Sequence, residues 1–321
     1  MKQRILVAGG AGFVGRQLVR NLRNSHDVCV LDSLKFGNRF DESDIASISL
    51  AKVDIRDWHS VAALIQSFRP EIVIHLAAIH FIPECERDPT LAAEVNVLGT
   101  MNLLRACPEG ARFVFASSGA VYQPDNSPHD ELNSVVAPAD VYGLTKLQAE
   151  QYVRYFVRQR GLCGAIVRLF NVIGPGETSP HILPEIVYQL KSGSTTIKLG
   201  NVWPQRDYIH VEDAAEGFER VALYGDIPAG ETKLVNLGTG KQYSVSMLLD
   251  QLRLLTGLPI AVEHDVSRAR SVDRPFLQAN IARIQVEFGW SPRVEIAAAL
   301  QDLWKNPDLA PGLVEQLRGR L

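Results

Sequence analysis

The chain has 321 residues, of which 46% are hydrophobic, so it can bury the core of one large α/β domain or of two domains. Its 33 basic and 36 acidic residues give a formal net charge of −3 without long runs of either sign, which disfavours a nucleic-acid or membrane partner and favours a small molecule. We predict a reduced, cytoplasmic protein, because no apolar run reaches about 18 residues, the apolar N-terminal segment is too short for a signal peptide, and the four cysteines form no C-x-x-C pair.

The first predicted strand runs directly into a glycine-rich turn, ILVAGGAGFVG. Gly9, Gly12 and Gly15 follow that strand and open a predicted helix over residues 14–24. Gly9 permits a tight turn, Gly12 lets a pyrophosphate approach the backbone, and Gly15 lets the helix pack on the strand. Free N–H groups at the start of the helix, where its dipole is positive, attract phosphates. The motif therefore predicts a dinucleotide site, with a glycine-rich turn that binds nothing as the alternative.

Asp32 ends the second predicted strand, VCVLD, about twenty residues beyond the glycines. A carboxylate at that place accepts a hydrogen bond from an adenosine ribose hydroxyl and repels a 2′-phosphate. The sequence therefore favours NAD over NADP, although the nearby Lys35 and Arg39 weaken that preference.

Short apolar runs alternate with helical patterns through the first half of the chain. The strand-like runs are RILVAG, DVCVLD, EIVIHLAA, RFVFASS and CGAIVRLF, and helical periodicity extends over residues 14–24, 58–68, 91–106 and 141–160. Because parallel strands are joined by right-handed crossovers, we predict an α/β fold whose doubly wound parallel sheet is covered by helices on both faces.

After Asn171 the elements become shorter and are separated by turns such as GPGETSP, LGNVWPQ and DIPAGETK. We predict a dinucleotide-binding domain over residues 1–172, with later contributions from about residues 205–240, and a smaller, interleaved C-terminal lobe over residues 173–204 and 241–321 that binds the substrate. The tail over residues 307–321 is expected to be loosely packed.

Tyr142 and Lys146 lie four residues apart on a predicted helix and therefore share one face. A tyrosine acts as a base near neutral pH only if its pKa falls from about 10 to near 7, and an ammonium group beside it stabilises the phenolate. Ser117 and Ser118 end the strand RFVFASS, where a hydroxyl can hold a substrate or cap the strand. A Y-x-x-x-K pattern alone is typical of an ordinary helix surface. A catalytic role for these residues is supported because they share a predicted sheet edge with the glycines.

These motifs resemble those of the extended short-chain dehydrogenase/reductase family, and in particular its nucleotide-sugar epimerases, dehydratases and 4-ketoreductases. They occur in the same order as in that family and extend along nearly the whole chain. The matching segments are GGAGFVG, VDIRD, VIHLAA, EVNVLGTMNLL, SSGAVY, YGLTK, RLFNVIGPG, RDYIHVEDAAEG, NLGTGKQYSV and FGWSP. The resemblance implies a Rossmann-type fold, NAD as the cofactor and a nucleotide sugar as the substrate.

The resemblance also implies roles for individual residues. Tyr142 would be the base and then the acid, Lys146 would lower its pKa and orient the nicotinamide ribose, and Ser118 would position the reacting hydroxyl. Asn96 would support the active site beside the cofactor. The remaining cofactor contacts would come from Gly9, Gly12, Phe13, Val14, Gly15, Asp32, Asp54, Ile55, Leu76, Ala77, Ala78 and Ser117.

The nucleotide sugar would be held by Ser118, Asn171, His181, Arg206, Arg270 and Asp273. The planar guanidinium forks of the two arginines suit a diphosphate, whereas a surface ion pair with Asp207 is the alternative for Arg206. His181 stands where relatives often carry an asparagine at the diphosphate.

The segment SSGAVY helps to distinguish among the reactions that members of this family catalyse. Related dehydratases resemble S-T-D-E-V-Y there and use the acidic pair to remove water, whereas Gly119 and Ala120 cannot move a proton, which disfavours dehydration. SSGAVY, Asp32 and AAIHFIPECERDPTLAAEVNVLGT look most like the 4-epimerases, with a UDP-sugar favoured. FNVIGPGETSP and SVDRPFLQANIARIQVEFGWSP look more like reductases and dehydratases that act on GDP-sugars, so a 4-ketoreductase is the alternative and a non-catalytic dinucleotide sensor a weaker one.

The spacing of the eight histidines indicates no metal site. Relatives commonly form dimers through two long helices, for which residues 91–106 and 141–160 are the candidates here. The sugar, the base and the pathway stay open.

Overall fold

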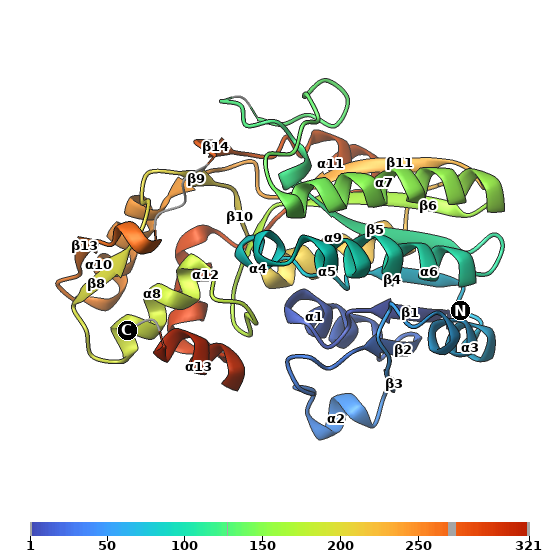
Figure 1. Cartoon of the computed structure of the whole chain (residues 1–321), viewed down its shortest axis with the longest axis horizontal. Coiled ribbons are helices and arrows are strands. Elements are labelled where there is room, and N and C mark those ends of the chain that lie inside the picture. Colours follow the sequence, from blue (N-terminus) through green and yellow to red (C-terminus); the bar gives the residue numbers. More distant parts are fainter. Residues whose placement is uncertain (1, 127, 269–273, 320–321) are drawn as a thin grey trace.

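The computed structural model describes residues 2–126, 128–268 and 274–319, and a seven-stranded parallel sheet forms its centre (Figure 1). The strand order is β11-β6-β5-β4-β1-β2-β3. The strands are β1 (Arg4–Ala8), β2 (Asp27–Asp32), β3 (Ser49–Lys52), β4 (Ile72–His75), β5 (Arg112–Ser118), β6 (Cys163–Leu169) and β11 (Thr232–Leu237). The order reverses beside β1, so the predicted doubly wound α/β fold is confirmed.

Successive side chains of the buried strands point to opposite sides of the sheet, so both faces of the sheet are apolar. In β1, Ile5 and Val7 pack into one core cluster, whereas Leu6 belongs to a second cluster on the opposite face. All three side chains are fully buried, as expected where helices cover both sides of a parallel sheet.

Each face of the sheet carries its own layer of helices. The first core contains side chains from α1 (Phe13–Leu22), α9 (Val211–Leu223) and α11 (Ala282–Phe288). The second contains side chains from α3 (Trp58–Phe68), α6 (Gly99–Ala106) and α7 (Val141–Arg160). The bounds of α3 and α7 are those that the apolar periodicity predicts.

The helix predicted over residues 91–106 is not continuous. It is divided into α5 (Pro89–Ala93), a π-helical turn η1 (Glu94–Leu98) and α6. The π-helical turn buries Asn96, which explains the local departure from regular α-helix, because such turns place single side chains at functional sites.

Periodicity did not reveal the two strands at the edges of the sheet. β3 is short and only half buried, with the mixed sequence SLAK. β11, whose sequence is TKLVNL, follows the turn-rich segment DIPAGETK and pairs with β6 along its whole length. Neither sequence has the unbroken apolar run that identifies a central strand.

A second group of elements lies on the left in Figure 1. Three helices, α8 (Ile182–Lys191), α10 (Val245–Thr256) and α12 (Ile296–Lys305), share one apolar core. Small sheets accompany them: β7 (Asn171–Ile173) pairs with β10 (Tyr208–His210), β8 (Thr196–Leu199) with β13 (Ala261–His264), and β9 (Gln205–Arg206) with both β12 (Tyr243–Ser244) and β14 (Phe276–Leu277). The assignment of residue ranges to two domains stays a prediction.

The expectation of a loosely packed tail is wrong for the described residues up to 319. Helix α13 (Pro311–Arg318) buries Leu313 and Leu317 against Ala310, with Tyr188 of α8 packed beside them. Asp308 forms ion pairs with Arg16 at 3.0 Å and with Arg39 at 2.6 Å. Apolar burial and two guanidinium partners therefore fix the tail to both parts of the molecule.

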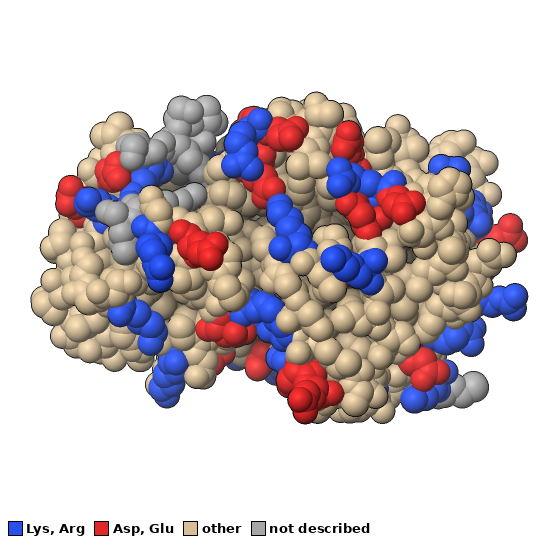
Figure 2. All heavy atoms as spheres, turned by 60° about the horizontal axis from the view of Figure 1, so that its bottom comes forward, with Lys and Arg blue, Asp and Glu red and all other residues tan. Residues whose placement is uncertain are grey.

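The remaining short elements are α2 (Glu42–Ile45), α4 (Ile82–Arg87), η2 (Gly119–Val121) and η3 (Val266–Arg268). Among the described residues, no helix has the length and apolar character needed to cross a membrane. Figure 2 shows basic and acidic side chains interspersed over the face that it presents.

Candidate active site

A cavity of about 1200 Å³ lies between the carboxyl ends of the sheet strands and the second group of elements. This is the place where ligands bind in doubly wound α/β folds. Among the residues predicted from the sequence, those that line it are Gly9, Gly12, Phe13, Val14, Gly15, Asp32, Asp54, Ile55, Leu76, Ala77, Ala78, Ser117, Ser118, Tyr142, Lys146, Asn171, His181 and Arg206. Arg270 and Asp273 lie outside the described residues.

The glycines form a tight cradle between β1 and α1. Gly9 has φ +83°, and a Cβ there would lie 2.5 Å from the backbone nitrogen of Ala77. A Cβ on Gly15 would lie 2.2 Å from the carbonyl oxygen of Gly9. At Gly12 the nearest protein atom would be 3.2 Å away, so this residue is less constrained by the protein itself and leaves room for a ligand.

Asp32 is held at the edge of this cradle. Its carboxylate accepts hydrogen bonds from the backbone N–H groups of Ala11 at 3.0 Å and Leu34 at 2.8 Å. Burial raises the pKa of Asp32, while these two bonds lower it. Lys35 pairs with Glu84 at 2.5 Å and Arg39 with Asp308, so both basic side chains that weakened the preference for NAD have acidic partners.

Asn96 does not line the cavity, although the resemblance placed it at the cofactor. Its side chain is 1% exposed, accepts a hydrogen bond from the backbone N–H of Ile79 at 2.8 Å and donates to the carbonyl of Ile79 at 2.9 Å. It also donates to the Thr145 hydroxyl at 3.0 Å, next to Lys146. Asn96 therefore fixes the segment after Ala78 relative to α7, and the supporting role that the resemblance implies for it stays a prediction.

Tyr142 and Lys146 project from the first turns of α7 towards the end of β5. The Lys146 ammonium lies 5.9 Å from the centre of the Tyr142 ring and donates to the carbonyl of Ala116 at 2.8 Å. Burial lowers the pKa of Lys146 to about 7. Burial also raises the pKa of Tyr142, although a hydrogen bond with Ser118 lowers it. Without a cofactor the pKa of Tyr142 is therefore raised, and the lowering expected from a neighbouring positive charge stays a prediction.

The Ser117 hydroxyl is committed to a buried network below the cavity. It donates to Glu150 at 2.6 Å, and Arg168 binds the same carboxylate with two nitrogens at 2.9 and 2.8 Å. Arg168 also lies over the Tyr122 ring, at 4.6 Å from its centre. Because Glu150 and Arg168 pair their opposite charges, the network connects α7 with β5 and β6 without leaving an uncompensated buried charge.

Arg274, which the sequence analysis missed, connects the segment before β14 with the start of α7. Its guanidinium is 8% exposed and donates to the carbonyls of Ala120 at 2.7 Å and Tyr122 at 3.0 Å. It also pairs with Asp140 at 3.0 Å, and Asp140 caps α7 by accepting from the N–H of Gly143. Arg274 therefore couples the turn after Ser118 to the start of the helix that carries Tyr142.

The predicted substrate residues come from β7, β9 and the start of α8. Asn171 opens β7, Arg206 lies in β9, and His181 directly precedes α8. Asp207 is fully buried and accepts hydrogen bonds from the backbone of Thr239 and Gly240, so it is no surface group. Arg206 lines the cavity and donates to the carbonyl of Arg274 at 2.7 Å.

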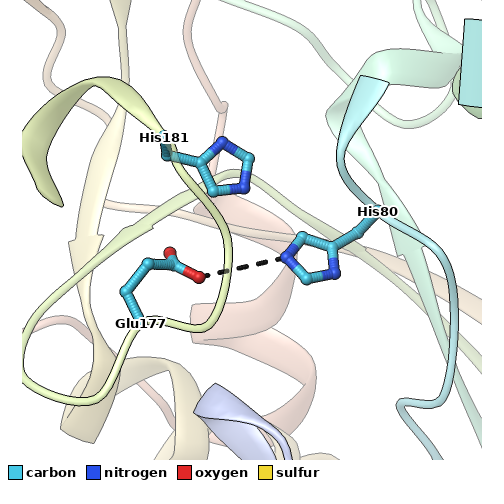
Figure 3. Close-up of side chains that lie close together, drawn as sticks. All are labelled: His80, Glu177 and His181. Atoms are coloured by element: carbon cyan, nitrogen blue, oxygen red, sulfur yellow. Dashed lines mark ion pairs between the residues drawn. The ribbon is translucent and has the colours of Figure 1, made fainter. Parts of the chain in front are cut away.

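His80 and Glu177 also line this cavity and were missed in the sequence. Glu177 is 5% exposed and lies within 4.0 Å of His80, beside His181 (Figure 3). The linear spacing of the histidines gives no sign of this cluster, because His80 follows β4 whereas Glu177 and His181 share the loop between β7 and α8.

Comparisons with known proteins agree along nearly the whole chain. A model of the NAD dependent epimerase/dehydratase family matches residues 5–238. A UDP-glucose 4-epimerase from Corynebacterium glutamicum is 31% identical, and the match covers 94% of each chain. A GDP-6-deoxy-D-mannose reductase from Pseudomonas aeruginosa is 28% identical, over 94% of this chain and 96% of the reductase.

A solved structure shows the same similarity in three dimensions. The complex of the Thermus thermophilus UDP-glucose 4-epimerase with NAD superimposes with a TM-score of 0.80 at 27% identity. The superposition covers 99% of this chain and all of that one.

Proposed function

Because the chain belongs to the NAD dependent epimerase/dehydratase family, we propose that it is a nucleotide-sugar 4-epimerase. The resemblance predicted from the motifs is thereby confirmed, and so is NAD as the cofactor. One observation carries the choice of reaction: Ser118, Tyr142 and Lys146 line the cavity, while the turn between them carries Gly119 and Ala120.

The cradle fits NAD. The space at Gly12 and the start of α1 suit a pyrophosphate, and Asp32 is placed to accept from a ribose hydroxyl. Bound NAD supplies a hydride acceptor at C4 of the sugar and a positive charge beside the Tyr142 phenol.

Tyr142 is the group that moves the proton. As a phenolate it takes the proton from the sugar 4-hydroxyl when C4 is oxidised, and it returns that proton when the 4-ketose is reduced on its other face. Ser118 donates a hydrogen bond that orients the reacting oxygen. Since burial raises the pKa of Tyr142, the protonated form of Lys146 and the charge of the cofactor are both needed to stabilise the phenolate.

Dehydration is disfavoured because it needs an acid and a base beside C5 and C6. Gly119 and Ala120 are buried, and neither side chain can transfer a proton. Small residues instead leave room for the ketose to turn in the pocket before reduction.

Arg206 and His181, and also Arg270 and Asp273 outside the described residues, are proposed to hold the nucleotide diphosphate and its ribose, and Asn171 the sugar. Arg206, Asn171 and His181 line the cavity from β9, β7 and the start of α8, elements separate from the glycine turn, which supports this division. A UDP-sugar is favoured because relatives named as UDP-glucose 4-epimerases are 31% and 32% identical.

The alternative is a reductase of a GDP-linked 4-keto-6-deoxy sugar, which the 28% identity to the Pseudomonas enzyme supports. The two reactions differ in the fate of the cofactor, because an epimerase regenerates NAD within each cycle whereas a reductase consumes a reduced dinucleotide.

We also propose that the protein forms a homodimer through η1 and α7. Leu98, Leu144 and Tyr155 on these elements are 52%, 47% and 53% exposed, although large apolar side chains favour burial. Light scattering of the protein and of a Tyr155→Glu variant tests this proposal: a dimer that becomes a monomer supports it, and a monomer in both contradicts it.

The proposed reaction is tested by denaturing the purified protein and identifying the released small molecules by mass spectrometry. Near-stoichiometric NAD, together with interconversion of UDP-glucose and its 4-epimer without added cofactor, supports an epimerase. A protein that carries no dinucleotide and oxidises NADPH only with a 4-keto sugar nucleotide contradicts it and supports the reductase.

A further inference from the structure

Three side chains that take no part in the proposed proton transfer converge inside the cavity, and only His181 among them is a proposed substrate contact. His80 follows β4, Glu177 lies in the loop after β7, and His181 precedes α8 (Figure 3). One ligand atom from each lies within 4.8 Å of the others. The His80 Nε2 atom is 4.0 Å from the Glu177 carboxylate.

Their neighbours already orient these side chains. The two imidazole rings stack with their centres 5.5 Å apart, and the Phe81 ring packs edge-on against His181 at 5.3 Å. These ring contacts restrict both imidazoles, and one nitrogen of each lies within 4.8 Å of an oxygen of the Glu177 carboxylate.

Glu177 brings a carboxylate into a buried place. Its side chain is 7% exposed, and its oxygen accepts from the backbone N–H groups of Thr178 at 2.8 Å and Ser179 at 3.2 Å. Burial nevertheless raises its pKa to about 7, because these two bonds compensate only part of the desolvation. A cation beside this carboxylate would compensate the remainder.

We propose that His80, Glu177 and His181 bind a divalent transition-metal ion of the Zn²⁺ type, whose open coordination position faces the nucleotide-sugar cavity. Two imidazoles and one carboxylate are a usual ligand set for zinc with a fourth position left to solvent or substrate. Tetrahedral coordination at about 2.0–2.2 Å places ligand atoms roughly 3.4 Å apart. Separations of up to 4.8 Å therefore need to close by no more than roughly 1.4 Å when the ion binds.

The open position suits a diphosphate oxygen, an inference that rests on the proposed function. Without the ion, the cluster presents a carboxylate to the cavity that must accept an anionic diphosphate. With the ion, the local charge becomes positive, because two positive charges outweigh one negative charge. His181, which stands where relatives often carry an asparagine at the diphosphate, would then contact the substrate through the metal.

Cobalt tests the site directly, since Co²⁺ bound by imidazole and carboxylate absorbs visible light. We expect the chelator-treated holoenzyme to bind one Co²⁺ per chain with such a spectrum. The Glu177→Gln and His80→Gln variants should bind it at least about 100-fold more weakly, because even residues that only support metal ligands contribute up to this factor. His264→Gln, on the exposed strand β13, is the matched control and should bind like the wild type.

Unchanged Co²⁺ binding in both cluster variants, or no visible spectrum in the wild type, overturns the proposal. NAD content and thermal unfolding show that each variant is folded. UDP then probes the open position: a changed Co²⁺ spectrum supports it, and an unchanged spectrum with UDP bound contradicts it. Titration of the metal-free protein with UDP reports nucleotide binding separately, so a failure of the proposed function is distinguishable from a failure of the metal site.

Discussion

The two walls of the cavity are built in different ways. The cofactor wall around Gly9 to Gly15 and Asp32 comes from one continuous β1-α1-β2 unit, and backbone atoms set its shape. The substrate wall is assembled from β7, β9, α8 and the segment before β14, which are far apart in the sequence and meet through side chains such as Arg274 and Arg206.

This difference shows which changes each wall tolerates. A backbone cradle fails when a single Cβ is added, because no rotamer can avoid the contact. A wall of side chains loses individual contacts but keeps its fold. The proposed catalytic residues lie on β5 and α7, and they line the same cavity as both walls.

Tyr142→Phe removes the proton-transferring group and is expected to have the largest effect. We expect kcat to fall by about 10²–10⁴-fold, the usual contribution of a general acid–base group, with NAD content unchanged. Steady-state kinetics measure this, and Tyr152→Phe on the exposed face of the same helix is the control. Activity within tenfold of wild type in Tyr142→Phe would show that another group moves the proton.

Gly15→Ala tests the cofactor wall. The added Cβ would meet the Gly9 carbonyl at 2.2 Å, so we expect a loss of about 1–3 kcal/mol in the free energy of unfolding and a lower NAD content. Denaturant unfolding measures the change in the free energy of unfolding. Gly312→Ala in α13, where no atom lies within 4 Å of the new Cβ, should not destabilise the protein and should gain up to about 1 kcal/mol from helix propensity. Equal effects in the two variants would contradict a close-packed cradle.

Asp32→Ala tests which dinucleotide the cofactor wall selects. Loss of a charged hydrogen-bond acceptor costs about 1.5–3 kcal/mol, so the Kd for NAD should rise roughly tenfold to 100-fold. The Kd for NADP should change much less, because the variant also removes a repulsive charge. Calorimetric titration measures the Kd values for NAD and NADP, and Asp27→Ala at the start of β2 is the control. Equal increases in the two Kd values would show that Asp32 does not bind the ribose.

Arg206→Ala tests the substrate wall. We expect nucleotide-sugar binding to weaken about tenfold through loss of a charge-assisted bond, while NAD binding is unchanged. The exposed Arg293→Ala variant should leave both unchanged. If isothermal titration showed weaker NAD binding and normal nucleotide-sugar binding, Arg206 would belong to the other wall.

The titration of Lys146 is expected to change the stability of the protein rather than ligand binding, and this effect is smaller than those above. Burial lowers its pKa from 10.5 to about 7, so the unfolded chain binds more protons than the folded one between these values. The free energy of unfolding of the cofactor-free protein should therefore rise between pH 7 and 9, by on the order of 1–2 kcal/mol. Lys146→Met should lose this rise, and a variant that retains it would assign the rise to other groups.

The sequence predicted the cofactor wall well because its determinants are local. The glycine spacing, Asp32 and the bounds of α3 and α7 all follow from neighbouring residues and apolar periodicity. The break in the predicted helix over residues 91–106 did not, because Asn96 adopts a π-helical turn for the sake of a tertiary contact with Ile79.

The substrate wall was harder to predict because its residues come together only through tertiary contacts. His80, Glu177 and Arg274 carry no local pattern, and their meaning appears only when loops from three parts of the chain converge. The packing of α13 was likewise hidden, since Leu313 and Leu317 find their apolar partner Tyr188 only in the folded chain. The raised pKa of Tyr142 results from burial, which the spacing of Tyr142 and Lys146 alone cannot report.

The central claim is that hydride leaves C4 of a nucleotide sugar and returns to the same carbon within one binding event. The most direct test is to incubate the purified protein with UDP-glucose in deuterated water, without added cofactor, and to follow the sugar by proton NMR. The account predicts a mixture of the two C4 epimers in which the hydrogen at C4 is fully retained. Deuterium at C4, or no second epimer from a protein that carries bound NAD and binds the nucleotide sugar, would contradict it.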